Sequence, residues 1–349
     1  MSATQAADGG QTGFSEDGLK DRLRAYMEGQ TGQKVEIGKW KRFPVGFSWI
    51  TYGFDATYDG RKHELILRLG PSDGLFAPYS AKPQYLVLKA LHGTGVAVPE
   101  AFWYSDDPSI LGLPFFICEK AEGEAPIPWG SAGEGFPKDY RETIGRQFVE
   151  QLAALHNFDW RNSELVEWDA GHSVDDVALR EVEYWAERHA HWALRPYPMA
   201  YRAIDWLRSN LPKAPRVSVV HGDYRIGNFL EKDNRITAIL DWELAHLGDP
   251  LEDIGWAFLP QYMGGSGLIC RLVERGEFLR LYNELTGIEV DEKALNFYTI
   301  LAQFKVGMTF VAGVSCFEDG SFHDMRMPAM GTQIFATFRQ IEKMIEAAS

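Results

Sequence analysis

His221-Gly-Asp-Tyr-Arg-Ile-Gly-Asn228, followed shortly by Ile239-Leu-Asp-Trp-Glu243, is the stretch of sequence that decides the fold. The apolar residues just before it predict a strand that ends at His221. Residues 229–230 and 236–240 predict the two arms of a hairpin, joined by a polar turn at residues 232–235. The sequence therefore predicts a loop that enters a hairpin.

Oxygen-bearing side chains should gather at the open end of this hairpin. A turn centred near Asn234 places Asn228 roughly opposite Asp241. Because adjacent strands lie about 4.8 Å apart, these two side chains could bind one divalent ion. Asp223 precedes Asn228 by five residues, so it could lie beside that ion without binding it. These residues alone are compatible with any metal-assisted reaction.

The composition is typical of a globular enzyme with two lobes. The chain has 349 residues, more than one hydrophobic core usually holds. Its 45% hydrophobic and 24% charged residues are ordinary proportions. The net charge of -14 argues against a nucleic-acid partner, which would need a basic patch. It leaves room for a cationic substrate, although solubility explains the charge equally well.

The cysteines and the N-terminal residues indicate a cytoplasmic protein. Cys118, Cys270 and Cys316 are far apart and lack metal-ligand spacing, which suggests a reducing compartment. Residues 1–17 contain no apolar segment of the kind that signal peptides have, so we expect a disordered tail. The longest uncharged run, residues 254–270, is broken by Pro260 and several glycines, so we expect no membrane span.

The pattern of the chain changes after residue 121. Before this point, strand patterns alternate with turns such as Asp59-Gly60. After a segment rich in proline and glycine, helical spacing dominates. We therefore expect an α+β fold, with a small lobe built on an antiparallel sheet over residues 18–121 and a larger helical lobe over residues 122–349.

The small lobe contains two features that suit a phosphate site. Gly46 and Ser48 lie between two strands, where backbone N–H groups could face a phosphate, although a glycine there is more often a simple turn. Arg68 alternates with leucines on a strongly apolar strand. It is either a cation held near a core or one whose charged end reaches solvent.

Three motifs together resemble the signature of the aminoglycoside phosphotransferase and choline kinase superfamily, the small-molecule branch of the protein-kinase-like fold. They are the two stretches quoted above and Gly248-Asp-Pro-Leu-Glu-Asp253, in that order. The protein-kinase His-Arg-Asp motif and its later Asn have the same spacing, with Gly222 in place of Arg. The resemblance covers most of the chain from about Lys39 and implies a two-lobed protein-kinase-like fold.

The resemblance also implies an ATP- and Mg²⁺-dependent kinase that phosphorylates a hydroxyl group. Asp223 matches the catalytic aspartate, which orients the acceptor hydroxyl and takes its proton. Asn228 and Asp241 match the ligands of Mg²⁺, which bridges the phosphates of ATP. Asp249 and Asp253 match an acidic pair that braces the catalytic loop or caps the next helix.

In the small lobe the resemblance implies the nucleotide contacts. Arg68 falls where the family has a phosphate-binding lysine, and Gln84 falls near the acidic residue that would pair with it. Gln84 cannot form an ion pair, which puts the positioning of Arg68 in question. Glu119, through its carbonyl, and Ala121, through its N–H, would contact adenine. Gly46 and Ser48 would cover the phosphates.

Within the superfamily the chain looks most similar to the phosphotransferase domains related to those fused to acyl-CoA dehydrogenases. Leu113-Pro-Phe-Phe116 and the helices around Gln84 and Lys305 carry this similarity. It implies a hydroxyacyl-CoA or another hydroxylated metabolite as the small-molecule acceptor. No nucleic-acid or membrane partner is expected, and the oligomeric state stays open.

Three other functions are compatible with parts of the sequence. An aminoglycoside or other antibiotic kinase is one, although the acidic residues at 175–187 alternate with basic ones and form no cluster for a polyamine. A nucleotide-binding pseudokinase or regulatory module is suggested by Gln84. A dinuclear metal hydrolase could use His221, Asp223, Asp241 and Asp249 as ligands. It would explain neither Arg68 nor the strand before Glu119.

Overall fold

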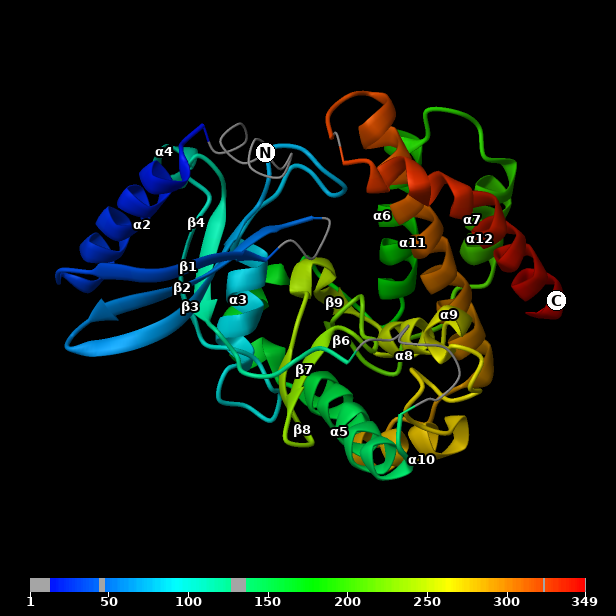
Figure 1. Cartoon of the computed structure of the whole chain (residues 1–349). Helices are drawn as coiled ribbons and strands as arrows, with labels where there is room; N and C mark the ends of the chain where they lie inside the picture. The colour runs from blue at the N-terminus through cyan, green and yellow to red at the C-terminus, as the bar shows by residue number, and fades with distance from the viewer. Residues whose placement is uncertain (1–12, 44–47, 127–135, 323, 349) are drawn as a thin grey trace. The chain divides into compact units, whose positions relative to one another are not determined.

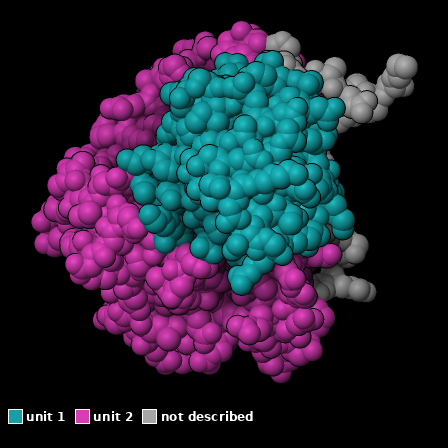
Figure 2. Space-filling model, turned by 90° about the vertical axis from the view of Figure 1, so that its left-hand side faces the viewer, with its two compact units in different colours: residues 1–89, 99–120 teal, residues 90–98, 121–349 magenta. Residues whose placement is uncertain are grey.

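The computed structural model describes residues 13–43, 48–126, 136–322 and 324–348 (Figure 1). Its contacts divide the chain into unit 1, residues 1–89 and 99–120, and unit 2, residues 90–98 and 121–349 (Figure 2). The sequence predicted one boundary after residue 121 and did not anticipate that residues 90–98 cluster with unit 2. In unit 2 the Ala97 N–H donates to Gln151 Oε1 at 2.6 Å, and the Ala97 carbonyl accepts from the Ile239 N–H at 2.7 Å.

Unit 1 is built on a five-stranded antiparallel sheet with the strand order β1-β2-β3-β5-β4. The β2–β3 turn is Asp59-Gly60, which has the positive φ angles of 53° and 68° that a tight hairpin turn needs. The strands are β1 (Glu36–Phe43), β2 (Ile50–Tyr58), β3 (Arg61–Leu69), β4 (Ala101–Ser105) and β5 (Phe115–Glu119).

Alternation along β3 gives its two sides different surroundings. Leu65, Leu67 and Leu69 are buried in a core that also contains the apolar side of helix α2 (Glu16–Thr31). Arg68 lies on the other side of the strand, with Gln84 of helix α3 (Lys82–Leu91). A short helix, α4 (Pro108–Leu111), completes the unit. The pleat of β3 thus directs the predicted phosphate-binding cation away from the leucine core.

Unit 2 is mainly helical, as predicted. Its long helix α11 (Glu292–Glu318) is surrounded by other helices and buries residues along most of its length. The remaining helices are α5 (Lys138–Asn157), α6 (Val177–Trp192), α7 (Pro198–Ser209), α8 (Leu251–Ala257), α9 (Pro260–Met263), α10 (Arg275–Thr286) and α12 (Arg326–Ala348), with 3₁₀ turns η1 (Trp160–Asn162), η2 (Glu164–Trp168) and η3 (Trp242–Leu244). The small antiparallel-sheet lobe and the larger helical lobe confirm the predicted fold class.

Helix α11 is also, within the described residues, the one helix long and apolar enough to cross a membrane. However, 72% of its most apolar window is buried inside the structure. It also carries the buried polar side chains Gln303 and Lys305. This burial is typical of a core helix.

Two small antiparallel pairs of strands carry the motif residues of unit 2. Strand β6 (Ser218–Val220) pairs with β9 (His246–Gly248), and β7 (Phe229–Lys232) pairs with β8 (Arg235–Ile239). The β7–β8 turn consists of Asp233 and Asn234, which have φ angles of 53° and 60°. The Ile236 N–H donates to Gln147 Oε1 at 2.9 Å, which fixes this hairpin to α5. The predicted strand and hairpin are therefore confirmed.

Candidate active site

The loop between β6 and β7, residues 221–228, alternates between buried apolar and partly exposed polar side chains. Tyr224 and Ile226 are buried, and the Tyr224 hydroxyl donates to the Phe148 carbonyl of α5 at 2.6 Å. The intervening Asp223 and Arg225 keep some exposure. The alternation therefore anchors one side of the loop in the core and leaves the polar side chains on the other side partly exposed.

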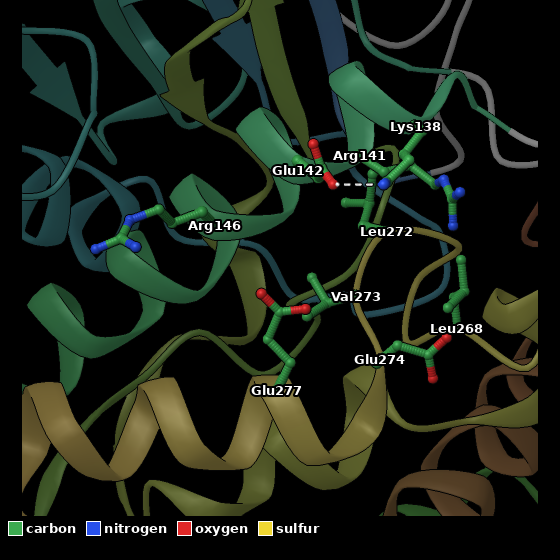
Figure 3. Close-up of a pocket in the computed structure, with 9 residues that line it drawn as sticks. All are labelled: Lys138, Arg141, Glu142, Arg146, Leu268, Leu272, Val273, Glu274 and Glu277. Atoms are coloured by element: carbon green, nitrogen blue, oxygen red, sulfur yellow. Dashed lines mark ion pairs between the residues drawn. The ribbon is translucent and has the colours of Figure 1, made fainter.

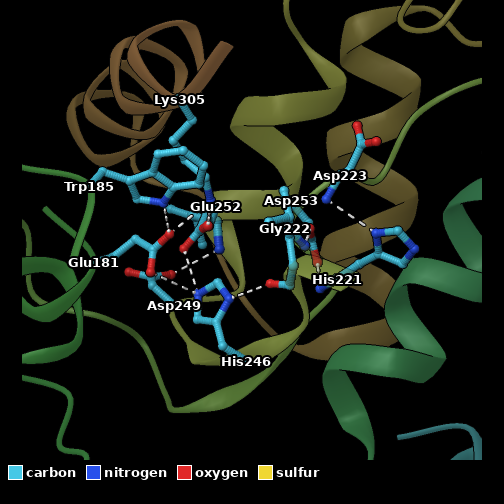
Figure 4. Close-up of polar contacts among 12 residues, drawn as sticks. Glu181, Trp185, His221, Gly222, Asp223, His246, Asp249, Glu252, Asp253 and Lys305 are labelled. Atoms are coloured by element: carbon cyan, nitrogen blue, oxygen red, sulfur yellow. Dashed lines mark hydrogen bonds and ion pairs between the residues drawn. The ribbon is translucent and has the colours of Figure 1, made fainter. Parts of the chain in front are cut away.

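Asp253 of α8 holds the first two residues of the loop (Figure 4). Its two carboxylate oxygens accept from the His221 N–H and the Gly222 N–H, both at 2.8 Å. His156 Nε2 donates to it at 3.1 Å. Burial raises the pKa of Asp253, but the hydrogen bonds from His156 and His221 lower it by more than burial raises it. The net pKa is therefore below its usual value. The buried carboxylate is therefore a charged anchor for the loop.

His221 connects the loop to the end of β8. Its Nδ1 accepts from the Asp223 N–H at 3.2 Å, so the proton of the ring lies on Nε2, which donates to the Leu240 carbonyl at 2.8 Å. The residue is completely buried. With both ring nitrogens engaged, His221 holds the loop in place.

Asp223 and Asn228 are in direct contact. Asn228 Nδ2 donates to the Asp223 carbonyl at 2.9 Å and to Asp223 Oδ2 at 2.6 Å. This arrangement leaves Asn228 Oδ1 without a hydrogen-bond partner in the described part of the chain. An amide oxygen is a ligand that Mg²⁺ accepts, so the orientation of Asn228 fits a metal site.

Asp241 lies one position further along than a direct pairing with Asn228 would need. The Leu240 N–H donates to the Asn228 carbonyl at 2.8 Å, so Leu240 is the residue opposite Asn228. An irregularity between Leu230 and Glu231 sets this register. Asp241 itself has left-handed backbone angles, φ 67° and ψ 57°, at the start of η3. The prediction that Asp241 lies roughly opposite Asn228 thus needs a correction of one residue.

Arg225 is a site residue that the sequence analysis missed. Its Nε donates to Asp223 Oδ1 at 2.9 Å, and its guanidinium lies 5.4 Å from the centre of the Tyr262 ring. Burial lowers the pKa of Arg225, but Asp223 raises it more, so the net shift is upward and the side chain stays charged. Its position two residues after Asp223 on an alternating loop was the available signal.

In unit 1, Arg68 contacts the side chain predicted to lie beside it. Its Nη1 is 3.4 Å from Gln84 Oε1, and its guanidinium lies 5.7 Å from the centre of the Trp49 ring. Trp49 is held in turn by Tyr79 and Phe116. The amide of Gln84 therefore contacts Arg68 even though it cannot form an ion pair.

The other predicted nucleotide contacts are described in part. Gly46 lies outside the described residues, and Ser48 is buried. The Glu119 N–H donates to the Glu100 carbonyl at 2.8 Å. The Ala121 N–H has no hydrogen-bond partner within the residues that the structure describes. The neighbouring Cys118 is buried, which raises the pKa of its thiol to about 12, so it is unreactive.

A buried cluster of charges lies near the loop of residues 221–228 (Figure 4). Lys305 Nζ donates to Glu181 Oε1 at 2.8 Å and to Glu252 Oε1 at 2.5 Å. His246 Nε2 lies 3.2 Å from Glu252 Oε2 and 3.4 Å from Glu181 Oε2. Burial lowers the pKa of His246, but the two carboxylates raise it to about 10. Two cations thus balance two anions, and the cluster joins α6, β9, α8 and α11.

This cluster bears on the alternative of a dinuclear metal hydrolase. Among the described residues, Glu181, His246 and Glu252 form the one group of three possible metal ligands whose ligand atoms lie within 4.8 Å of one another. None of them belongs to the predicted metal site, and Lys305 occupies both carboxylates. Asp249, another proposed ligand of the hydrolase, accepts from the Leu251 N–H at 2.8 Å and caps α8. The arrangement therefore does not support that alternative.

A cavity in the described part of the chain lies elsewhere (Figure 3). It has a volume of about 240 Å³ and is lined by α5, α10 and the segment between α9 and α10. Basic side chains of Lys138, Arg141 and Arg146 alternate there with acidic ones. None of the predicted site residues contributes to it, so we assign it no role in the reaction.

Gly222 has a conformation and surroundings that exclude a side chain. Its φ is 82°, and a Cβ atom would lie 2.6 Å from the Leu244 carbonyl oxygen. We therefore expect Gly222→Ala to displace the loop and to lower activity far more than Gly276→Ala, a control where a Cβ meets nothing within 4 Å. Steady-state kinetics with thermal unfolding would check this. Equal activity of the two variants would contradict it.

The two-lobed fold, the loop with Asp223 and Asn228, and the hairpin before Asp241 define a phosphotransferase of the protein-kinase-like class. The model of the phosphotransferase enzyme family matches residues 40–283. The chain therefore belongs to this family, and the expected class of small-molecule kinase is confirmed.

Individual relatives agree with this assignment. Mouse acyl-CoA dehydrogenase family member 10 is 30% identical over 306 residues, which cover 82% of this chain and 27% of that protein. The chain spans about a third of the length of the curated relatives it matches, for example 38% of human member 11.

Solved structures share the fold. A Ralstonia eutropha protein provisionally assigned as an aminoglycoside phosphotransferase superposes with a TM-score of 0.74 at 23% identity, over 95% of this chain and 99% of that one. A thermostable mutant of an aminoglycoside phosphotransferase, in complex with ADP and hygromycin B, superposes with a TM-score of 0.57 at 15% identity. The match covers 93% of this chain and 98% of that one. At these identities the likeness concerns the fold alone.

Proposed function

We propose that this chain is an ATP- and Mg²⁺-dependent kinase of the cytoplasm that phosphorylates a hydroxyl group of a small molecule. The contact between Asp223 and Asn228 at the mouth of the hairpin carries the proposal, because it joins a base to a metal ligand. Asp223 orients the acceptor hydroxyl and takes its proton, and positioning and charge stabilisation supply most of the rate.

Mg²⁺ is assigned to Asn228 and Asp241. The free Oδ1 of Asn228 and the carboxylate of Asp241 are the hard oxygen ligands that this ion prefers. When bound, the ion offsets negative charge on the phosphates as the phosphoryl group is transferred.

We assign ATP to Arg68, Ser48 and Gly46 for its phosphates and to Glu119 and Ala121 for its base. The open N–H of Ala121 and the placement of Arg68 by Trp49 and Gln84 support this assignment. The ADP named for a structure with the same fold also supports it.

Asp241→Ala should weaken the binding of Mg²⁺ and AMP-PNP together by about 10-fold or more, because a charged ligand of the ion is lost. Calorimetry with AMP-PNP, with and without Mg²⁺, measures this effect. Asp205→Ala, on the exposed side of α7, is the control. An equal affinity of wild type and Asp241→Ala in Mg²⁺ would remove Asp241 from the site.

For the acceptor we propose a hydroxyacyl-CoA or another hydroxylated metabolite that is not a polycation. Several acidic side chains of unit 2 are already paired: Asp223 with Arg225, Glu181 and Glu252 with Lys305, and Glu183 with Arg208. A polyamine antibiotic would need carboxylates that are not already paired with protein cations. The name of the mouse relative, acyl-CoA dehydrogenase family member 10, points to acyl-CoA chemistry as the first class to test.

An ATP-consumption screen over hydroxyacyl-CoAs, other hydroxylated metabolites, choline-like amines and antibiotics tests the proposal. Turnover with a hydroxyacyl-CoA is the expected result. Turnover with aminoglycosides alone would show that the proposed acceptor is wrong. Antibiotics are included in the screen because a structure with the same fold was solved in complex with hygromycin B. Binding of AMP-PNP without turnover on any acceptor would instead indicate a regulatory module.

A further inference from the structure

Arg225 is placed firmly beside the proposed catalytic base. Its Nε contacts Asp223 Oδ1 at 2.9 Å, and its side chain is only 21% exposed. The Tyr262 ring lies against the guanidinium, and Tyr262 is itself buried. A planar group held by a carboxylate and an aromatic ring has little freedom to turn, so its remaining nitrogens have defined positions.

The hydrogen bonds of Arg225 do not use all of these nitrogens. Nε donates to Asp223 and Nη1 donates to the Ile226 carbonyl at 3.1 Å. Nη2 makes no hydrogen bond to any residue that the structure describes. Because this nitrogen belongs to a fixed, charged group next to the base, it presents two N–H donors to whatever binds there.

We propose that Arg225, through Nη2, binds an anionic oxygen that arrives beside Asp223 during the reaction. This inference rests on the kinase function proposed above. Guanidinium N–H groups form short, charge-assisted hydrogen bonds with phosphate and carboxylate oxygens. The same side chain therefore positions Asp223 through Nε and binds substrate through Nη2.

The anionic oxygen has two possible sources, which differ in the substrate that carries it. One is the terminal phosphoryl group of the nucleotide, and the other is a phosphate or carboxylate of the acceptor. Arg225→Met removes the charge but keeps a long apolar side chain beside Tyr262, and Arg225→Lys keeps a cation without the planar fork. Arg180→Met is the matched control, because Arg180 forms a similar pair with Asp176 at 3.0 Å on the surface.

The test compares AMP-PNP with ADP by calorimetry in Mg²⁺, and measures KM for hydroxybutyryl-CoA. If the source is the nucleotide, Arg225→Met should lower the affinity for AMP-PNP by about 10- to 100-fold. The affinity for ADP should stay within about 2-fold of the wild-type value. If the source is the acceptor, both nucleotides should bind normally while KM rises by a similar factor. Arg225→Lys should recover part of the loss in either case.

Other outcomes would overturn the proposal. One such outcome is an equal loss of affinity for AMP-PNP and ADP, and another is a fall in kcat with no change in any affinity or KM. Either would show that Arg225 only positions Asp223 and binds no anionic oxygen. A loss of thermal stability relative to Arg180→Met, together with no rescue by lysine, would have the same meaning. If the wild-type chain binds neither nucleotide, the kinase function itself fails, and this inference fails with it.

Discussion

Asp223→Asn is expected to lower phosphoryl transfer by about 10²- to 10⁴-fold while the fold stays intact. The substitution removes the proton acceptor and changes little else in shape. Asn228 Nδ2 and Arg225 Nε contact the two oxygens of Asp223, and an asparagine keeps one of them. Kinetics with the acceptor found by the screen, together with thermal unfolding, measures both halves of the prediction.

The matched control is Asp176→Asn, which alters a carboxylate in a comparable pair with an arginine outside the loop. It should keep wild-type turnover. The affinity of AMP-PNP for Asp223→Asn should stay close to that of the wild type, because the assigned role of Asp223 is toward the acceptor. Full turnover by Asp223→Asn would show that another group accepts the proton.

The parts of the fold that follow from local pattern could be predicted from the sequence. The β7–β8 hairpin is one, because its polar turn separates two short apolar arms and needs residues that tolerate positive φ, here Asp233 and Asn234. The spacing of Asp223 and Asn228 was equally local. Both side chains lie on one short loop, so the contact between them needed no knowledge of distant packing.

Features that depend on distant packing could not be predicted in the same way. Lys305 meets Glu181, 124 residues away, only because α11 crosses α6 in the folded lobe. The docking of residues 90–98 on unit 2 depends on Gln151, a polar residue on an otherwise ordinary helix. The position of Asp241 was off by one residue because the turn pairs Lys232 with Arg235, and the extra residue Thr237 in β8 shifts the pairing by only one position.

Asp253→Ala is the second substitution for which we expect a large effect, this time on stability as well as activity. It would leave three buried donors without their acceptor: the N–H groups of His221 and Gly222, and Nε2 of His156. At about 1 kcal/mol or more for each unsatisfied donor, the free energy of unfolding should fall by at least about 3 kcal/mol. Urea unfolding of the variant and the wild type measures this loss.

Asp249→Ala provides the comparison that separates anchoring from burial. Asp249 is also a buried carboxylate on the same segment, but its hydrogen bond goes to the Leu251 N–H, where it caps α8. Losing that cap should cost about 0.5–2 kcal/mol and leave the loop in place. If both variants lost the same stability and activity, the loss would come from removing a buried carboxylate, and the contact of Asp253 with the loop would have no special role. If Asp253→Ala alone lost turnover under conditions where it is still folded, its carboxylate holds the catalytic loop in its active conformation.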